Sequence, residues 1–124
     1  MTIDEFYVSI NGNYKEIKGR LSTEERIKRF LLKFLEIDDM DVLKNAWEND
    51  DYQNLFTYSN RIKGIALNLS FDSLADSTSK LIELSKTGTL KDKKSASEIY
   101  ERCCQEYDLI EKNIILFFLY FHFF

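Results

Sequence analysis

Residues 52–69 read YQNLFTYSNRIKGIALNL, and the fold can be worked out from here in both directions. Successive residues of an α-helix lie about 100° apart around its axis. At that spacing the core-forming side chains fall on one side, and they are Leu55, Tyr58, Ile62, Ile65, Ala66 and Leu69. The stretch contains no proline, and its other side is mixed in character. The pattern predicts one long amphipathic helix with one face against a core and the other in solvent.

The first 20 residues predict only one short helix. Residues 1–10 form a short amphipathic segment, and the turn-prone residues 11–13 follow it. We expect another turn around Gly19, because glycine in a polar segment is a common turn signal.

Two further helices are predicted before the central one. Ser22 and Glu25 have the spacing of a capping box, so a helix should begin there and end near Ile37. Asp39 or Asp41 can cap a second, shorter helix. Its inward residues are expected to be Met40, Leu43, Ala46 and Trp47.

Two more helices are predicted after the central one. Asp72 or Ser73 can cap the first, and Gly88 is a suitable residue to end it. The second should begin near Ser95. Its inner face is expected to contain Ala96, Ile99, Cys103, Tyr107, Ile110 and Ile114.

The composition agrees with a wholly helical protein. The 124 residues include no proline and four glycines, so the main helix breakers are scarce. Short connections favour antiparallel neighbours. We expect an all-α fold, an up-and-down antiparallel four-helix bundle with an additional short N-terminal helix. The predicted division is an N-terminal segment of residues 1–20, a bundle of residues 21–113 and an apolar C-terminal extension of residues 114–124.

Charge and cysteine content narrow the classes of function. The formal net charge is −4 and no basic stripe with interleaved aromatic residues is present, which argues against nucleic-acid binding. Cys103 and Cys104 are neighbours, and neighbours on a helix do not face each other. We therefore expect two reduced thiols in a cytoplasmic protein. The single histidine, His122, is far from both cysteines, so we expect neither a metal site nor a cofactor.

The solvent side of the central helix carries a candidate protein-binding surface of five residues. They are Phe56, Asn60, Lys63, Gly64 and Leu67, which fall between about 80° and 180° from the core side. A glycine in an exposed helix costs roughly 1 kcal/mol against alanine. Close approach of another protein would explain Gly64 and the apolar Phe56 and Leu67 beside it. The alternative is a neutral glycine among scattered apolar residues.

The sequence of residues 58–69, YSNRIKGIALNL, resembles the signature of the histidine-containing phosphotransfer (Hpt) domain family. That signature is a histidine, two residues, a lysine and a glycine, then small and apolar positions leading to an Asn-Leu or Leu-Gly pair. Lys63 and Gly64 match the lysine and glycine, and Asn68 and Leu69 resemble the later pair.

The resemblance extends to the helices around this motif. Residues 27–35 resemble the first bundle helix of the family, residues 43–56 the segment that leads into the active helix, and residues 74–88 the helix that follows. In all, it covers roughly residues 20–113.

The family resemblance implies a role in phosphate relay between receiver domains. In Hpt domains the histidine attacks an aspartyl phosphate, the lysine stabilises the phosphoryl charge and the glycine allows close docking. Here Asn60 stands at the histidine position. Its amide nitrogen is a very poor nucleophile, because its lone pair is delocalised into the carbonyl. The resemblance thus implies a pseudo-Hpt protein and no enzyme: a decoy or adaptor that binds a response-regulator receiver domain or a histidine kinase without accepting phosphate.

Two other functions stay open. One is an active phosphotransfer protein that uses another acceptor, or in which Asn60 has been introduced in place of a histidine. His122 lacks a lysine and a glycine at the motif spacing, which argues against it as that acceptor. The other is a structural or assembly protein that acts through residues 114–124.

Residues 114–124 are all apolar except His122. As a helix they would be about 16 Å long, which is too short to span a bilayer. We expect this segment to pack against the rest of the protein or to self-associate. A shallow membrane-surface anchor is the alternative, although the segment lacks the Lys/Arg-rich face of an interfacial helix.

Overall fold

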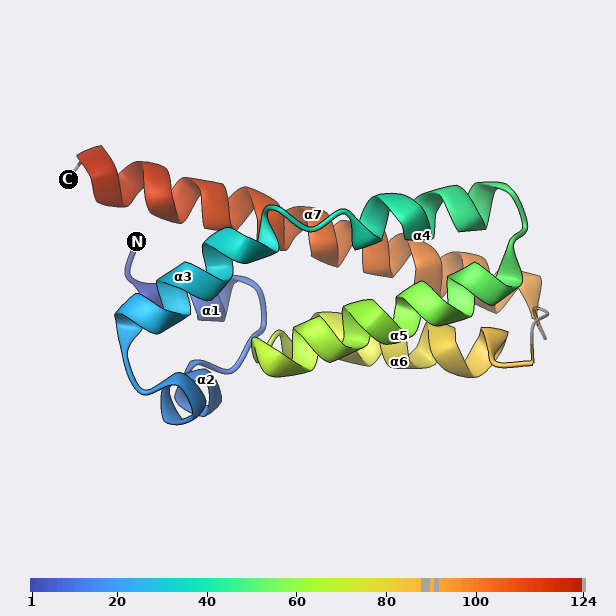
Figure 1. The fold of residues 1–124 in the computed structure, drawn as a ribbon, viewed down its shortest axis with the longest axis horizontal. Coiled ribbons are helices and arrows are strands. Elements are labelled where there is room, and N and C mark those ends of the chain that lie inside the picture. Colours follow the sequence, from blue (N-terminus) through green and yellow to red (C-terminus); the bar gives the residue numbers. More distant parts are fainter. Residues whose placement is uncertain (88–89, 91, 124) are drawn as a thin grey trace.

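The computed structural model describes residues 1–87, 90 and 92–123, with the side chains of residues 120–123 excepted. Every regular element in this part of the chain is an α-helix (Figure 1), which confirms the predicted all-α class. The helices are α1 (Ile3–Ser9), α2 (Tyr14–Leu21), α3 (Glu24–Phe34), α4 (Asp39–Glu48), α5 (Tyr52–Asn68), α6 (Asp72–Ser85) and α7 (Lys93–Phe123).

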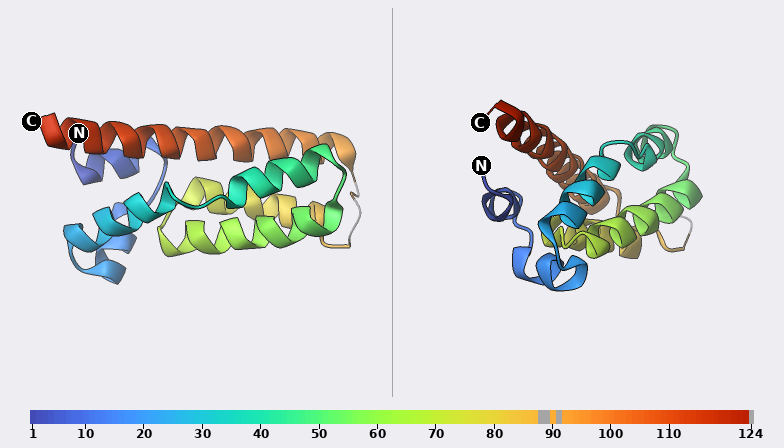
Figure 2. Two further views of the ribbon diagram at one scale, coloured as in Figure 1. Left: turned by 45° about the horizontal axis from the view of Figure 1, so that its top comes forward. Right: turned by 60° about the vertical axis from the view of Figure 1, so that its left-hand side comes forward.

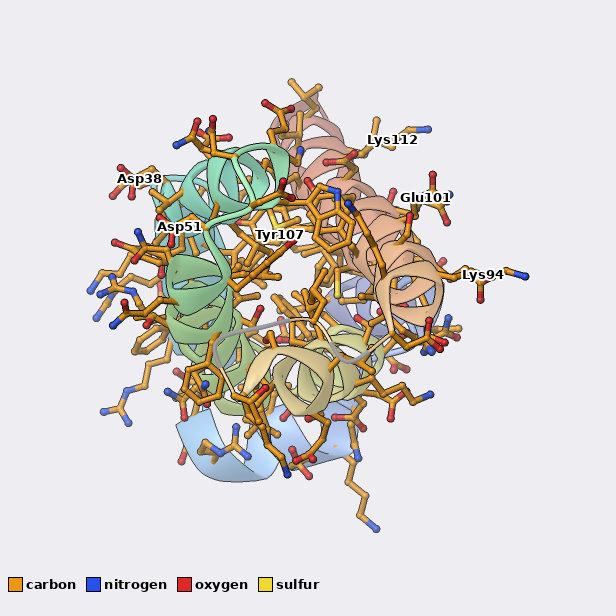
Figure 3. All side chains as sticks on the ribbon, turned by 90° about the vertical axis from the view of Figure 1, so that its right-hand side faces the viewer. Asp38, Asp51, Lys94, Glu101, Tyr107 and Lys112 are labelled. Atoms are coloured by element: carbon orange, nitrogen blue, oxygen red, sulfur yellow. The ribbon has the colours of Figure 1, made fainter. Side chains whose placement is uncertain are left out.

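The helices form two groups along α7, the longest of them (Figures 1 and 2). In one group α4, α5 and α6 lie beside the N-terminal part of α7, and successive helices run in opposite directions. Viewed from the end, these four helices surround shared side chains that include Tyr107 (Figure 3). In the other group α1 and α3 contact α7, and α2 contacts both α1 and α3.

Side-chain caps explain where several helices begin. Thr2 forms a capping box with Glu5 in front of α1. The side-chain oxygens of Asn13, Thr23 and Asp51 each accept a hydrogen bond from the backbone N–H three residues further on, at the starts of α2, α3 and α5. Each cap satisfies a donor that the first helical turn leaves unpaired.

Three predictions for the N-terminal part differ from the structure. Gly19 lies inside α2 rather than in a turn, because Asn13 caps a helix there that buries Ile17. Ser22 does not begin the next helix, because its φ of 70° ends α2 and Thr23 provides the cap of α3. α3 also ends at Phe34, earlier than the predicted Ile37.

The two aspartates predicted to begin α4 and α6 do not cap them. Neither helix has a side-chain hydrogen bond at its N-cap, and Asp39 and Asp72 are instead the first helical residues. Asp39 is buried and bound to Arg61, so its carboxylate is not available to the backbone. The predicted end of the α6 helix at Gly88 lies outside the described residues.

An aromatic cluster joins the N-terminal helices to the rest of the molecule. The ring of Phe34 on α3 lies 5.3 Å from Phe71 and 4.8 Å from Tyr107, measured between ring centroids. The hydroxyl of Tyr7 donates to the carbonyl oxygen of Leu69 at 2.9 Å. These rings are buried, and rings of this size contribute strongly to the hydrophobic stabilisation of a core. The C-terminal end of α5 is therefore held firmly against α1 and α3.

α7 buries the face that its periodicity predicts. All six predicted inner residues are buried except Ile99, which is half-buried. The helix continues without a break through Asn113, so the predicted boundary at residue 114 falls inside it. Phe117 is 2% exposed and its ring lies 6.3 Å from that of Phe6, so this face of the apolar tail packs against α1. Over the described residues, no helix combines the length and apolar character that crossing a bilayer requires.

Candidate functional site

The candidate site lies on the solvent face of α5. The residues that this helix buries are Leu55, Ser59, Ile62 and Ala66. The five residues predicted to bind a partner lie outside this set. Asn60, Gly64 and Leu67 are exposed, whereas Phe56 and Lys63 are half-buried. The helical spacing therefore predicted correctly which side of α5 faces away from the core.

Asn60 lies near the middle of α5 with its side chain in solvent. Its Nδ2 atom donates a hydrogen bond to the carbonyl oxygen of Phe56, one turn earlier, at 3.0 Å. The Oδ1 atom accepts no hydrogen bond from the described residues, so a donor on another molecule can reach it. A carboxamide in this position can bind, but it offers no nucleophilic nitrogen.

Lys63 supplies a positive charge beside Asn60. Among the described residues it forms no ion pair, in contrast to Arg61 next to it in the sequence. An ammonium group without an internal carboxylate is available for a charge-assisted hydrogen bond to an anionic group on a partner.

Gly64 leaves an uncovered patch of backbone one turn after Asn60. A Cβ atom added here would meet nothing within 4 Å, so neither packing nor backbone conformation requires glycine. The same is true of Gly19 on α2, so an open glycine is not by itself a sign of a binding site. What distinguishes Gly64 is its position beside Asn60 and Lys63.

An ion pair between α4 and α5 borders the site and was not predicted. Arg61 donates from Nε to Oδ2 of Asp39 at 3.1 Å and from a terminal nitrogen to Oδ1 at 3.3 Å. Its guanidinium also lies 5.0 Å from the centre of the Tyr58 ring. The two partners of the ion pair are 22 residues apart, so no local spacing could have revealed it.

A shallow hollow of about 330 Å³ lies beside this ion pair, along α5. It is lined by Asp39, Asn60, Arg61, Gly64, Ile65 and Asn68. Of the five predicted residues, the structure brings Asn60 and Gly64 together here. Phe56, Lys63 and Leu67 are not part of the hollow and lie toward the other flank of the helix. The site thus has two parts, the hollow and, beside it, the half-buried or exposed side chains of Phe56, Lys63 and Leu67.

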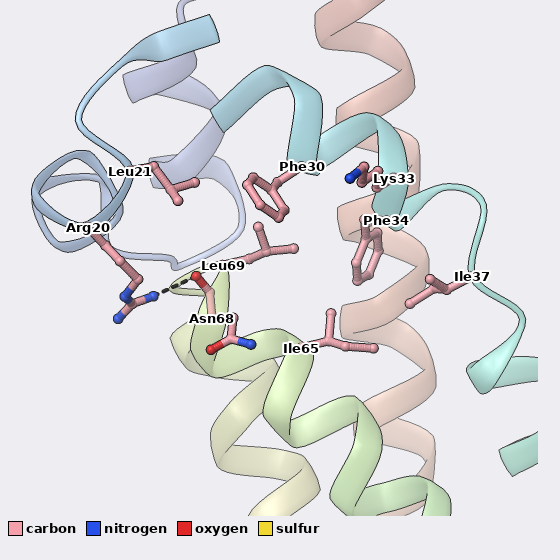
Figure 4. Close-up of a pocket in the computed structure, with 9 residues that line it drawn as sticks. All are labelled: Arg20, Leu21, Phe30, Lys33, Phe34, Ile37, Ile65, Asn68 and Leu69. Atoms are coloured by element: carbon pink, nitrogen blue, oxygen red, sulfur yellow. Dashed lines mark hydrogen bonds between the residues drawn. The ribbon is translucent and has the colours of Figure 1, made fainter. Parts of the chain in front are cut away.

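A deeper groove adjoins the hollow at the C-terminal end of α5 (Figure 4). Its volume is about 370 Å³, and it shares Ile65 and Asn68 with the hollow. The other walls come from α2, α3 and the segment that follows α3. This groove could not be predicted from local spacing, because its lining residues belong to segments far apart in the chain.

The two cysteines lie on α7 and not on α5. Both cysteines are free, and burial raises the pKa of the Cys103 thiol to about 12. In the part of the chain that the structure describes, no three His, Cys, Asp or Glu side chains gather closely enough to hold a metal ion. The side chain of His122 is outside the described residues.

Comparison of the chain with models of known protein families, with curated proteins and with solved structures gave no match in any of the three.

Proposed function

We propose that this protein is a pseudo-Hpt protein of a two-component phosphorelay. It binds a receiver domain or a histidine kinase as a decoy or adaptor and accepts no phosphate. In this proposal α4, α5, α6 and the N-terminal part of α7 serve as an Hpt-like, up-and-down four-helix bundle, and the solvent face of α5 is the docking surface. The segment expected to be the first bundle helix, residues 27–35, belongs instead to α3, which contacts α2 and α7 outside this group.

One observation carries the proposal: Asn60, at the position of the family's histidine, is exposed on α5 with Lys63 and Gly64 beside it. If the Asn60 side chain were buried in the core, it could not contact a docking partner. The exposed position keeps the amide, the cation and the open backbone available to one approaching surface. Only the nucleophile is missing, and its absence prevents transfer without removing these contacts.

The first experiment tests docking. Receiver domains and histidine kinases from the same cell are passed over the immobilised protein, and we expect at least one to bind. Gly64→Arg should abolish that binding by filling the open patch, whereas the matched Gly19→Arg on α2 should leave it intact. Absence of binding to all of them, with an unchanged circular dichroism spectrum, would contradict the proposal.

The second experiment tests transfer. A receiver domain that binds is phosphorylated with radiolabelled phosphate and mixed with the protein, and we expect no label on the wild-type chain. Asn60→His should gain acid-labile label, because it restores an imidazole next to Lys63 and Gly64. Label on the wild-type protein would instead support an active phosphotransfer protein with another acceptor.

A second candidate function is assembly through the apolar tail. Ile115, Leu116 and Leu119 on α7 are 42–50% exposed. Truncation after Asn113 is a poor test, because it also removes the buried Ile114 and Phe117. The double variant Leu116→Ser, Leu119→Ser changes only exposed positions. The assembly function would be favoured if this variant lost self-association or partner binding while Gly64→Arg kept both.

A further inference from the structure

The groove at the C-terminal end of α5 has the size and shape of a small-molecule site. Its volume of about 370 Å³ falls in the range of roughly 300–1,000 Å³ that ligand pockets occupy. Phe30 stands at its edge with 41% of its surface exposed, and Phe34, Ile65 and Leu69 form its floor and walls (Figure 4). Such a surface favours an apolar ligand body.

Both charged side chains that line the groove are positive. No acidic residue lines it, and the two charged lining residues are Arg20 and Lys33. Arg20 is already engaged, because it donates to the carbonyl oxygens of Leu67 and Asn68 and pairs with Glu16. Among the described residues Lys33 forms no ion pair, and its ammonium lies 5.4 Å from the centre of the Phe30 ring. Lys33 is therefore the cation that a ligand can reach.

The surroundings reinforce this charge. Residues 14–35, which hold α2 and α3, carry seven basic and three acidic side chains, whereas Glu36 and Asp38 flank the lining residue Ile37 in the sequence. The excess of basic residues on α2 and α3 favours an anion over a cation beside Lys33.

We propose that this groove binds a small anionic amphiphile of the medium-chain carboxylate class. The alkyl chain packs on Phe34, Ile65 and Leu69, and the carboxylate is held by Lys33 at the groove edge. This inference rests on the groove alone and does not depend on the proposed phosphorelay function.

Three probes with the same chain and different head groups test it: decanoate, decanamide and decyltrimethylammonium. Binding is followed by NMR through the methyl signals of Leu21, Ile37, Ile65 and Leu69. We expect decanoate to bind more tightly than the other two and to shift these groove signals. Equal affinity for the three head groups, or shifts confined to exposed residues of α7 such as Leu116, would overturn the proposal.

Matched variants locate the head group. Lys33→Gln should weaken decanoate binding about fivefold and remove its advantage over decanamide, because it deletes the charge-assisted hydrogen bond. Lys15→Gln makes the same charge change at an exposed α2 position outside the groove and should have no such effect. Equal losses of decanoate affinity in the two variants would show that net charge alone causes the effect, and this would refute the site. Groove signals that shift with protein concentration alone, and not with decanoate, would assign the groove to a second copy of the chain.

Discussion

Arg61 on α5 holds the carboxylate of Asp39 on α4 through two hydrogen bonds, at 3.1 and 3.3 Å. The side chain of Asp39 is 7% exposed, whereas that of Arg61 is 58% exposed. A carboxylate this deeply placed needs its partner, because an unpaired buried charge is costly. The pair therefore fixes the beginning of α4 against the helix that carries Asn60.

Arg61→Ala should destabilise the protein by removing the partner of a nearly buried carboxylate. The measurement is the midpoint of urea unfolding. Lys86→Ala is the control, because it breaks a pair with Glu83 in which both side chains are well exposed, and such pairs contribute little. Arg61→Ala should lower the midpoint of urea unfolding clearly more than Lys86→Ala does. Equal effects would mean that water already satisfies Asp39.

Gly64→Ala should stabilise the protein by about 0.5–1 kcal/mol, because alanine is the better helix former and its Cβ meets nothing within 4 Å. Gly19→Ala should stabilise it by a similar amount for the same reason. Only Gly64→Ala should also weaken binding of a receiver domain, because the added methyl group lies on the proposed docking surface. Thermal unfolding and a binding titration on both variants separate stability from docking. Weakened binding in both variants, or in neither, would count against a role for Gly64.

Phe117→Ala should cost about 3 kcal/mol of unfolding free energy, because it empties a buried aromatic site beside Phe6. Leu116→Ala, at a neighbouring position that is 42% exposed, should cost much less. Amide hydrogen exchange should show loss of protection in α1 for the first variant only. Unchanged protection of α1 would show that the tail does not hold the N-terminal helix.

Glu111→Gln should stabilise the protein at neutral pH. Burial raises the pKa of Glu111 above its ordinary value of 4.5, and the nearby Asp108 raises it further. A raised pKa in the folded state means that ionisation of Glu111 costs stability as the pH rises through that pKa. The gain from Glu111→Gln should therefore be present at about pH 7 and vanish below pH 4.5.

Urea unfolding at both pH values measures this difference. Glu101→Gln changes an exposed glutamate of the same helix and serves as the control. A gain that persists unchanged in acid would show that it does not come from the ionisation of Glu111.

The strongly periodic helices could be predicted from local spacing alone. The core side of α5 and the inner face of α7 follow from apolar residues that recur once per helical turn, and the exposure of Asn60 follows with them. α2 was missed because it buries a single residue, Ile17, so its amphipathic signal is weak and Gly19 suggested a turn. The start of α3 was misplaced because Ser22 and Thr23 are both suitable caps, and the φ of 70° at Ser22 is not visible in a sequence.

Periodicity established the strongly amphipathic helices and the outward direction of Asn60, because both depend only on contacts within a few residues. The tertiary structure decided what surrounds Asn60. Asp39 reaches Arg61 from 22 residues away, and the groove beside Ile65 needs α2 and α3 to lie against the end of α5. These contacts depend on how separate helices pack. A pattern within one helix can predict which face is buried, but not which side chains of another helix it meets.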